Sequence, residues 1–382
     1  TWCVLALASA RRVGFEVDDE HFQGAYRLFR DLADPTTGRI GYDSMGSTSA
    51  RIPGVNDNYS TKYAEAITAA SLHAMGSMGM ASKSDRLWAA SYALLEGTPP
   101  IWRDNFGADV YFLMHGAAAL RYAYPGGGAE WLKAVREVVV PVQRTKKCAK
   151  GSWDPLGPWC FAGGRVYSTA AMVLSLDPLI TPSLGMVPIA SSARKFEGAP
   201  GPGLLSPAAR KATKRSRKSL GMIEDGLAWL AKHQSDDGYW SDLQLTLKCD
   251  RGARSGTCEA TESEAKLTCT SLALLAFMGE GHYAGQDGPY RKTVDLALSF
   301  LVDEYSIVPS NARTSYSSER DHGLSDRAFP ALALIEAAGG VMDPDLQAFA
   351  KRVAESLLTA RLADGGWCRG KGLAGTTDQG EF

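Results

Sequence analysis

The stretch that decides the fold reads Gln234-Ser235-Asp236-Asp237-Gly238-Tyr239-Trp240, a glycine followed by aromatic residues. Apolar residues precede it at helical spacing (Ile223, Leu227 and Leu230), which is typical of an amphipathic helix with one buried face. The pattern of a glycine and then an aromatic residue recurs in three further segments: Asp364-Gly365-Gly366-Trp367, Thr37-Gly38-Arg39-Ile40-Gly41-Tyr42 and Lys150-Gly151-Ser152-Trp153. One motif returning at long intervals indicates a chain built from structural repeats.

A second kind of helix follows such a turn after a variable loop, and it is apolar on nearly all sides. The clearest example is Thr270-Ser271-Leu272-Ala273-Leu274-Leu275-Ala276-Phe277, which should be buried on both faces. One outer amphipathic helix and one inner apolar helix make a hairpin, and the repeat length is about 50 residues. The chain holds six such hairpins: 219–279, 289–339, 344–382 continued through 1–13, 19–80, 83–124 and 129–177. We therefore expect an all-α fold, an (α/α)6 toroid of six helical hairpins.

The two ends of the chain predict that this ring is opened inside one inner helix. Thr376-Thr377-Asp378-Gln379-Gly380-Glu381-Phe382, read into Thr1-Trp2-Cys3-Val4-Leu5-Ala6-Leu7-Ala8, gives one amphipathic helix cut in two. A ring with adjacent ends tolerates relocated termini. We expect a circularly permuted order in which 219–382 is the N-terminal half of the toroid, with hairpins 1–3. Residues 1–178 are then the C-terminal half, with hairpins 4–6 and the end of hairpin 3.

A segment rich in proline and glycine, 179–218, joins these halves and shows no helical periodicity. Its later part, Arg210-Lys211-Ala212-Thr213-Lys214-Arg215-Ser216-Arg217-Lys218, is strongly basic and could meet an anionic partner such as nucleic acid or a membrane surface. Because no aromatic residues interleave the run, we favour a solvated linker.

Composition narrows the classes of function. A hydrophobic content of 45% allows a large core, and a formal net charge of −1 gives no reason to expect nucleic acid as a partner. No apolar run reaches the roughly 18 residues that a transmembrane helix needs. We expect a soluble protein, and its cysteine usage is compatible with an extracytoplasmic location.

The seven cysteines suggest pairings rather than a metal site. Cys249 and Cys258 flank a polar loop that a disulfide could clip in an oxidising compartment, and Cys148 and Cys160 bracket the turn at Gly151 in a similar way. Neither a C-x-x-C pair nor a histidine pair at ligand spacing occurs, so we predict no metal and no cofactor.

The segment from Gly226 to Trp240 resembles the Gln-Trp repeat of the prenyltransferase and squalene-oxidase-repeat family, within the terpenoid cyclase and protein prenyltransferase superfamily. That resemblance implies an (α/α)6 toroid. Three further stretches look like bacterial members of the superfamily: Lys150-Gly151-Ser152-Trp153-Asp154-Pro155, Gly163-Gly164-Arg165-Val166-Tyr167-Ser168-Thr169-Ala170 and Asp321-His322-Gly323-Leu324. The similarity covers nearly everything except the linker, in permuted order.

The chemistry that the family implies is not matched residue by residue. Class II cyclases protonate an alkene with an Asp-x-Asp-Asp cluster, which is absent, and the nearest acidic run, Asp18-Asp19-Glu20, is interpreted as the charged start of a helix. Protein prenyltransferases hold a zinc ion with Asp, Cys and His, but Asp378 and Cys3 do not have the required Asp-x-Cys spacing across the joined ends.

In a toroid, the loops before the inner helices converge on one mouth of the central cavity. Asp321 beside His322 could orient the imidazole as a general base, or could merely cap its helix. The candidate catalytic residues at this mouth are Asp321, His322, Asp326, Asp109 and Asp378. The candidate ligand-binding residues, which could equally pack within hairpins, are Trp2, Tyr111, Phe112, Trp153, Tyr167 and Arg165.

Two classes of function follow from these patterns. The first is a toroid like the terpenoid cyclases and prenyltransferases that binds or transforms an apolar, isoprenoid-like small molecule in its cavity, as a transferase or isomerase if it is an enzyme. The second is a non-catalytic toroid that binds a protein partner. A deep cavity with converging carboxylates favours the first class, and a hole plugged by side chains favours the second.

Overall fold

The computed structural model describes residues 1–122, 127–177, 217–245, 249, 258, 263–307 and 324–361. Across these residues the chain is all-helical, as predicted: they contain no β-strand and only two isolated β-bridges, Ala33 with Ile40 and Arg103 with Gly107. The α-helices are α1 (Trp2–Val13), α2 (Asp19–Asp31), α3 (Ala66–Ser77), α4 (Arg86–Glu96), α5 (Val110–Ala119), α6 (Ala129–Val139), α7 (Gly164–Leu176), α8 (Arg217–Lys232), α10 (Lys266–Gly279), α11 (Arg291–Ile307), α12 (Leu324–Gly340) and α13 (Pro344–Thr359).

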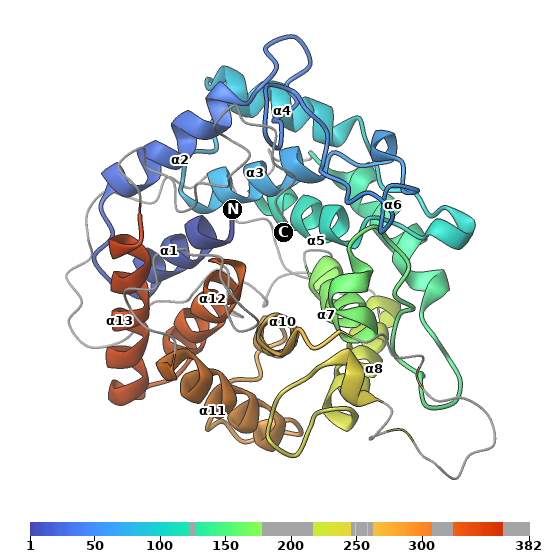
Figure 1. Ribbon diagram of the computed structural model, residues 1–382, viewed down its shortest axis with the longest axis vertical. Helices are drawn as coiled ribbons and strands as arrows, with labels where there is room; N and C mark the ends of the chain where they lie inside the picture. The colour runs from blue at the N-terminus through green and yellow to red at the C-terminus, as the bar shows by residue number, and fades with distance from the viewer. Residues whose placement is uncertain are drawn as a thin grey trace.

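The helices form two layers. Helices α1, α3, α5, α7, α10 and α12 lie around the middle of the molecule, and α2, α4, α6, α8, α11 and α13 surround them (Figure 1). Each inner helix packs against the next in that order, and α12 packs back against α1, so the inner contacts form a closed cycle. The burial pattern explains the layers. The inner helix α10 buries Leu267 and every residue from Cys269 to Gly279, whereas the outer helix α2 buries only Phe22, Gly24, Ala25 and Phe29.

The turn glycines of the repeated motif lie in the left-handed region, where a side chain is disfavoured. The φ angles of Gly38, Gly151 and Gly238 are 76°, 92° and 91°. Each also touches the backbone of the next outer helix along the chain. A Cβ built on Gly38 would lie 2.6 Å from the carbonyl oxygen of Ala90 in α4. On Gly151 and Gly238 it would lie 2.1 Å and 2.3 Å from the carbonyl oxygens of Asp225 in α8 and Leu296 in α11.

The residue two positions after each of these glycines is tied to an inner helix by a hydrogen bond. The backbone N–H groups of Ile40, Trp153 and Trp240 donate to the hydroxyls of threonines in α3, α7 and α10: Thr68 at 3.1 Å, Thr169 at 3.3 Å and Thr270 at 3.0 Å. The same contact in three places shows that the turns are structurally equivalent. The glycine thus places the turn against one neighbour, and the threonine fixes it to its own inner helix.

The buried tryptophans of this motif are also anchored by their indole groups. Trp240 donates from Nε1 to the carbonyl of Leu230 at 2.8 Å, and Trp153 donates from Nε1 to the carbonyl of Val139 at 2.8 Å. Both acceptors lie at the end of the preceding outer helix, where carbonyl groups lack partners within the helix. In these two turns, the tryptophan that marks the motif therefore holds the turn against the end of the preceding outer helix.

Besides the fourth turn motif, Asp364-Gly365-Gly366-Trp367, two expectations fall on parts of the chain outside the described residues. The predicted continuation of a helix from Asp378 through the joined ends is one of them; α1 begins at Trp2 and packs against α3, α12 and α13. The predicted linker 179–218 is the other, apart from its last two residues, which belong to α8. None of the described helices combines the length and apolarity that a membrane crossing requires.

Candidate functional site

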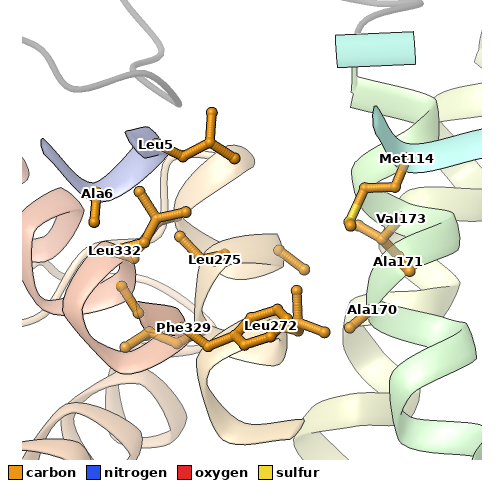
Figure 2. Packing of buried hydrophobic residues seen from close by; sticks show 14 of the residues in the cluster. Leu5, Ala6, Met114, Ala170, Ala171, Val173, Leu272, Leu275, Phe329 and Leu332 are labelled. Atoms are coloured by element: carbon orange, nitrogen blue, oxygen red, sulfur yellow. The ribbon is translucent and has the colours of Figure 1, made fainter. Parts of the chain in front are cut away.

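A cavity of about 60 Å³ lies among the inner helices, and every one of them contributes to its wall. Figure 2 shows the apolar side chains of Leu5, Leu275 and Leu332, from α1, α10 and α12, on one side of this interior, and Met114 of α5 on the other. The complete lining is Trp2, Leu5, His73, Met114, His115, Ala118, Arg121, Tyr122, Leu174, Asp177, Leu272, Leu275, Leu332 and Glu336.

Two histidines meet in the cavity wall. Nδ1 of His73 on α3 lies 3.0 Å from Nδ1 of His115 on α5, so one ring donates this hydrogen bond and the other accepts it. His115 is completely buried, and its Nε2 atom has no hydrogen-bond partner among the described residues. The rings of Trp2 and Tyr111 enclose it, with centroids 4.9 Å and 4.3 Å from the imidazole.

Both histidines are neutral at pH 7. Burial lowers the pKa of His73 to about 3, with a smaller contribution from the charge of Arg121. Burial also lowers the pKa of His115 well below its usual value, and His73 adds to that shift. Because both rings are neutral, His115 Nε2 is either an N–H donor or a bare acceptor, depending on which ring donates at Nδ1.

This neutral pair should make the folded state sensitive to acid. Free histidine titrates near pH 6.5, so below that pH the unfolded chain binds protons that the folded chain excludes, and stability falls as the pH drops from 6.5 toward about 3. We expect a loss of up to about 1.4 kcal/mol per pH unit for each histidine. Urea unfolding measured between about pH 7 and pH 5 should show this slope, and the variant H73Q/H115Q should show a shallower one. An unchanged slope in the variant would contradict the assignment.

The cavity also holds ionisable groups at the ends of the inner helices. Glu336 of α12 is only 1% exposed and accepts a hydrogen bond from the hydroxyl of Ser9 in α1. Arg121 and Asp177, which follow α5 and α7, form a buried ion pair with a separation of 4.0 Å. These groups give an otherwise apolar cavity a few fixed polar contacts, which is the usual composition of a small-molecule site.

Among the predicted catalytic residues, Asp109 is not part of the cavity lining. Asp109 caps α5, where its carboxylate accepts from the backbone N–H of Phe112 at 3.1 Å and lies 3.9 Å from Arg51. Burial raises the pKa of this carboxyl group. Asp326 lies in the first turn of α12, and Asp321, His322 and Asp378 lie outside the described residues. The convergence of these groups on one mouth remains a prediction.

Of the six predicted ligand-binding residues, Trp2 lines the cavity. Tyr111 packs behind it, with its ring centroid 6.4 Å from that of Trp2. Phe112 packs against Trp131 of the outer helix α6. Trp153 and Tyr167 are buried among neighbouring helices and are not part of the cavity lining.

Arg165 is also placed away from the cavity lining, in the first turn of α7. It is 1% exposed, and its guanidinium donates to Asp154 at 2.6 Å and to the hydroxyl of Ser152 at 3.1 Å. These contacts join the start of α7 to the turn that precedes it. These two contacts give the arginine a structural role within the fold, and its Nε atom has no hydrogen-bond partner among the described residues.

The cysteines differ from the sequence expectation. Cys148, Cys160, Cys249 and Cys258 are free thiols, so the suggested Cys249–Cys258 and Cys148–Cys160 bridges are not formed. Cys160 instead accepts a hydrogen bond from Ser168 at 3.2 Å. Cys148, Cys249 and Cys258 gather around His233, and the ligand atoms of all four lie within 4.8 Å of one another. Sequence reasoning missed this cluster because Cys148 and His233 lie in segments apart from the loop that Cys249 and Cys258 flank.

No protein-family model matches the chain, and no curated protein matches it.

Proposed function

We propose that the chain is an (α/α)6 toroid of six helical hairpins in permuted order, and that its central cavity binds an apolar, isoprenoid-like small molecule. The closed cycle of contacts among the inner helices supports the ring, and the contribution of every inner helix to the cavity wall supports a site on the ring axis. Ligand sites of helical proteins commonly lie between helices in this way.

The observation that carries the proposal is the unpartnered Nε2 atom of His115 in the cavity wall. A buried polar atom without a partner costs about 1–3 kcal/mol, which a ligand with a matching group would recover. The surrounding wall is supplied mainly by leucine, methionine and tryptophan side chains. The ligand that fits this arrangement has an apolar body and one hydroxyl or carbonyl group directed at His115.

The size of the cavity limits how such a ligand enters. A volume of about 60 Å³ holds a few non-hydrogen atoms, whereas sites for drug-sized ligands span roughly 300–1,000 Å³. A longer isoprenoid must therefore displace wall side chains, and Met114 is suited to this because its thioether chain has several rotatable bonds. The alternative, a non-catalytic ring that binds a protein partner, needs no such rearrangement.

The test is binding of isoprenoid alcohols, the matching hydrocarbons and isoprenoid diphosphates to the full chain, measured by native mass spectrometry and titration calorimetry. The variant A118L, which fills the cavity, should abolish binding, and A93L, the same change at an exposed site on α4, should not. The variant H115L should weaken the alcohol about tenfold and leave the hydrocarbon unaffected, because it removes one hydrogen bond. Equal binding by A118L and the wild type, or no binding of any compound, would overturn the proposal and favour the protein-partner alternative.

A further inference from the structure

The cluster of Cys148, His233, Cys249 and Cys258 brings together distant parts of the fold. Cys148 lies in the turn between α6 and α7, and His233 directly follows α8. Cys249 and Cys258 lie between α8 and α10. Cys249 and Cys258 are 4% and 1% exposed, and His233 is 3% exposed. Such a concentration of thiols and an imidazole away from solvent needs an explanation, because none of the three cysteines is in a disulfide.

The distances between the side chains match a tetrahedral metal site. Ligand lengths of about 2.3 Å for sulfur and 2.0–2.1 Å for nitrogen place sulfur and nitrogen about 3.6 Å apart around a tetrahedral zinc ion. Nε2 of His233 lies 3.2 Å from Sγ of Cys148, 3.6 Å from that of Cys258 and 4.0 Å from that of Cys249. The observed values thus scatter around the tetrahedral distance.

The histidine is also held in the tautomer that a metal requires. Nδ1 of His233 lies 2.7 Å from the carbonyl oxygen of Trp229, which can only accept, so Nδ1 carries the proton. Nε2 is then a bare lone pair directed at the three sulfur atoms. Metal-binding histidines generally donate their second ring nitrogen to a carbonyl or carboxylate in this manner. The indole ring of Trp229 stacks on the imidazole at 4.4 Å and fixes its orientation.

A backbone contact supports one of the sulfur atoms as well. The N–H of Cys258 donates to Sγ of Cys249 at 3.2 Å, an arrangement that stabilises negative charge on the sulfur. Three thiolates around a divalent ion leave one net negative charge. Three lysines, Lys146, Lys147 and Lys150, flank Cys148 in the sequence and supply positive charge to this turn.

We propose that Cys148, His233, Cys249 and Cys258 bind one structural zinc ion. Three sulfur ligands and one imidazole are a set that structural zinc sites use, and hard cations such as magnesium or calcium prefer oxygen ligands. Four protein ligands complete a tetrahedral shell and leave no position for water or substrate, so the site is structural rather than catalytic.

The position of the site indicates which parts of the chain the zinc ion would connect. Cys148 belongs to the part of the chain that precedes the predicted linker 179–218, and the other three ligands belong to the part that follows it. The helices on either side, α7 and α8, pack against each other next to the cluster. Zinc would therefore cross-link the part of the chain that precedes the predicted linker to the part that follows it, and binding energy at such a site adds to folding energy.

The first experiment measures metal content. The full chain, purified under reducing conditions, should carry about one zinc ion per molecule by elemental mass spectrometry. The variants C148S, H233A and C258S should carry none, whereas C160S, which changes a buried thiol outside the cluster, should retain it. Absence of zinc from the wild type after addition of zinc to the reduced protein would overturn the proposal.

A second measurement covers the case in which a cluster variant fails to fold. Cobalt added to the metal-free wild-type chain should give the sulfur-to-metal charge-transfer absorption and the intense visible bands of a tetrahedral thiolate centre. Chelation should lower the melting temperature of the wild type and leave that of folded H233A unchanged. A wild-type chain that binds no cobalt, or one whose intact mass shows a disulfide among Cys148, Cys249 and Cys258 after purification under reducing conditions, would contradict the assignment.

Discussion

Replacing Gly238 with alanine is expected to destabilise the protein by about 3 kcal/mol or more. Alanine at a φ of 91° is strained by roughly 1–2 kcal/mol, and its methyl group would lie 2.3 Å from the carbonyl oxygen of Leu296. A backbone atom cannot rotate away as a side chain can, so α11 has to shift, and overpacking of this kind costs about 1–3 kcal/mol. Urea unfolding of the purified variant gives the free energy directly.

The matched control for this change is Gly285. Its φ is 71°, but a Cβ built there meets nothing within 4 Å. G285A should therefore show only the conformational strain, roughly 1–2 kcal/mol. The difference between the two variants isolates the contact with α11. Equal losses at both positions would mean that Gly238 is required for its backbone angle alone and does not hold the neighbouring outer helix.

The second large effect is expected on replacing Asp154 with alanine. Arg165 is 1% exposed, and Asp154 is the carboxylate bound to its guanidinium, at 2.6 Å. Removing it leaves a buried positive charge whose remaining contact with a described side chain is the hydroxyl of Ser152. Breaking a buried ion pair from one side costs about 3–5 kcal/mol, and unfolding should show a loss near the lower end because Asp154 is itself partly exposed.

Two further variants test whether the loss of stability in D154A comes from breaking a buried ion pair. D287A removes one of the two carboxylates that pair with the exposed Arg291, the other being Asp295, and should cost less than about 1 kcal/mol. The double change D154A/R165M should recover part of the loss, because no uncompensated charge remains. If D154A were as stable as the wild type while R165M alone abolished ligand binding, the predicted role of Arg165 in binding a ligand would be favoured over its structural role.

The all-α fold could be predicted from the sequence because the inner helices are apolar on nearly every side. The same property prevented the sequence from indicating which residues line the cavity. When all faces of a helix are apolar, no periodicity indicates which residue faces the centre, so Phe112 and His115, one turn apart on α5, could not be distinguished by pattern. Their directions are set by packing: Phe112 meets Trp131 of an outer helix, and His115 lines the cavity.

The cysteine and histidine cluster could not be predicted for a different reason. Zinc motifs are recognised by pairs of ligands at short spacing, but here Cys249 and Cys258 are nine residues apart, and Cys148 and His233 lie in other segments. Cys148 reaches His233 through folding, in which the turn at Gly151 rests on α8. The glycine and aromatic motif was visible in the sequence, but the threonine that receives each turn was not, since one threonine on an apolar helix gives no pattern.

The contact between each turn glycine and the next outer helix bears on which fragment of this protein can fold independently. Gly38, Gly151 and Gly238 each rest on a helix that belongs to the following helix pair, so one outer and one inner helix do not contain both surfaces of that contact. The smallest autonomous unit must then exceed a single pair, and stability should be shared between neighbours, as it is in other repeat architectures. If such a chain grew by gene duplication, each added pair of helices would have to present the surface on which the turn glycine of the preceding pair rests.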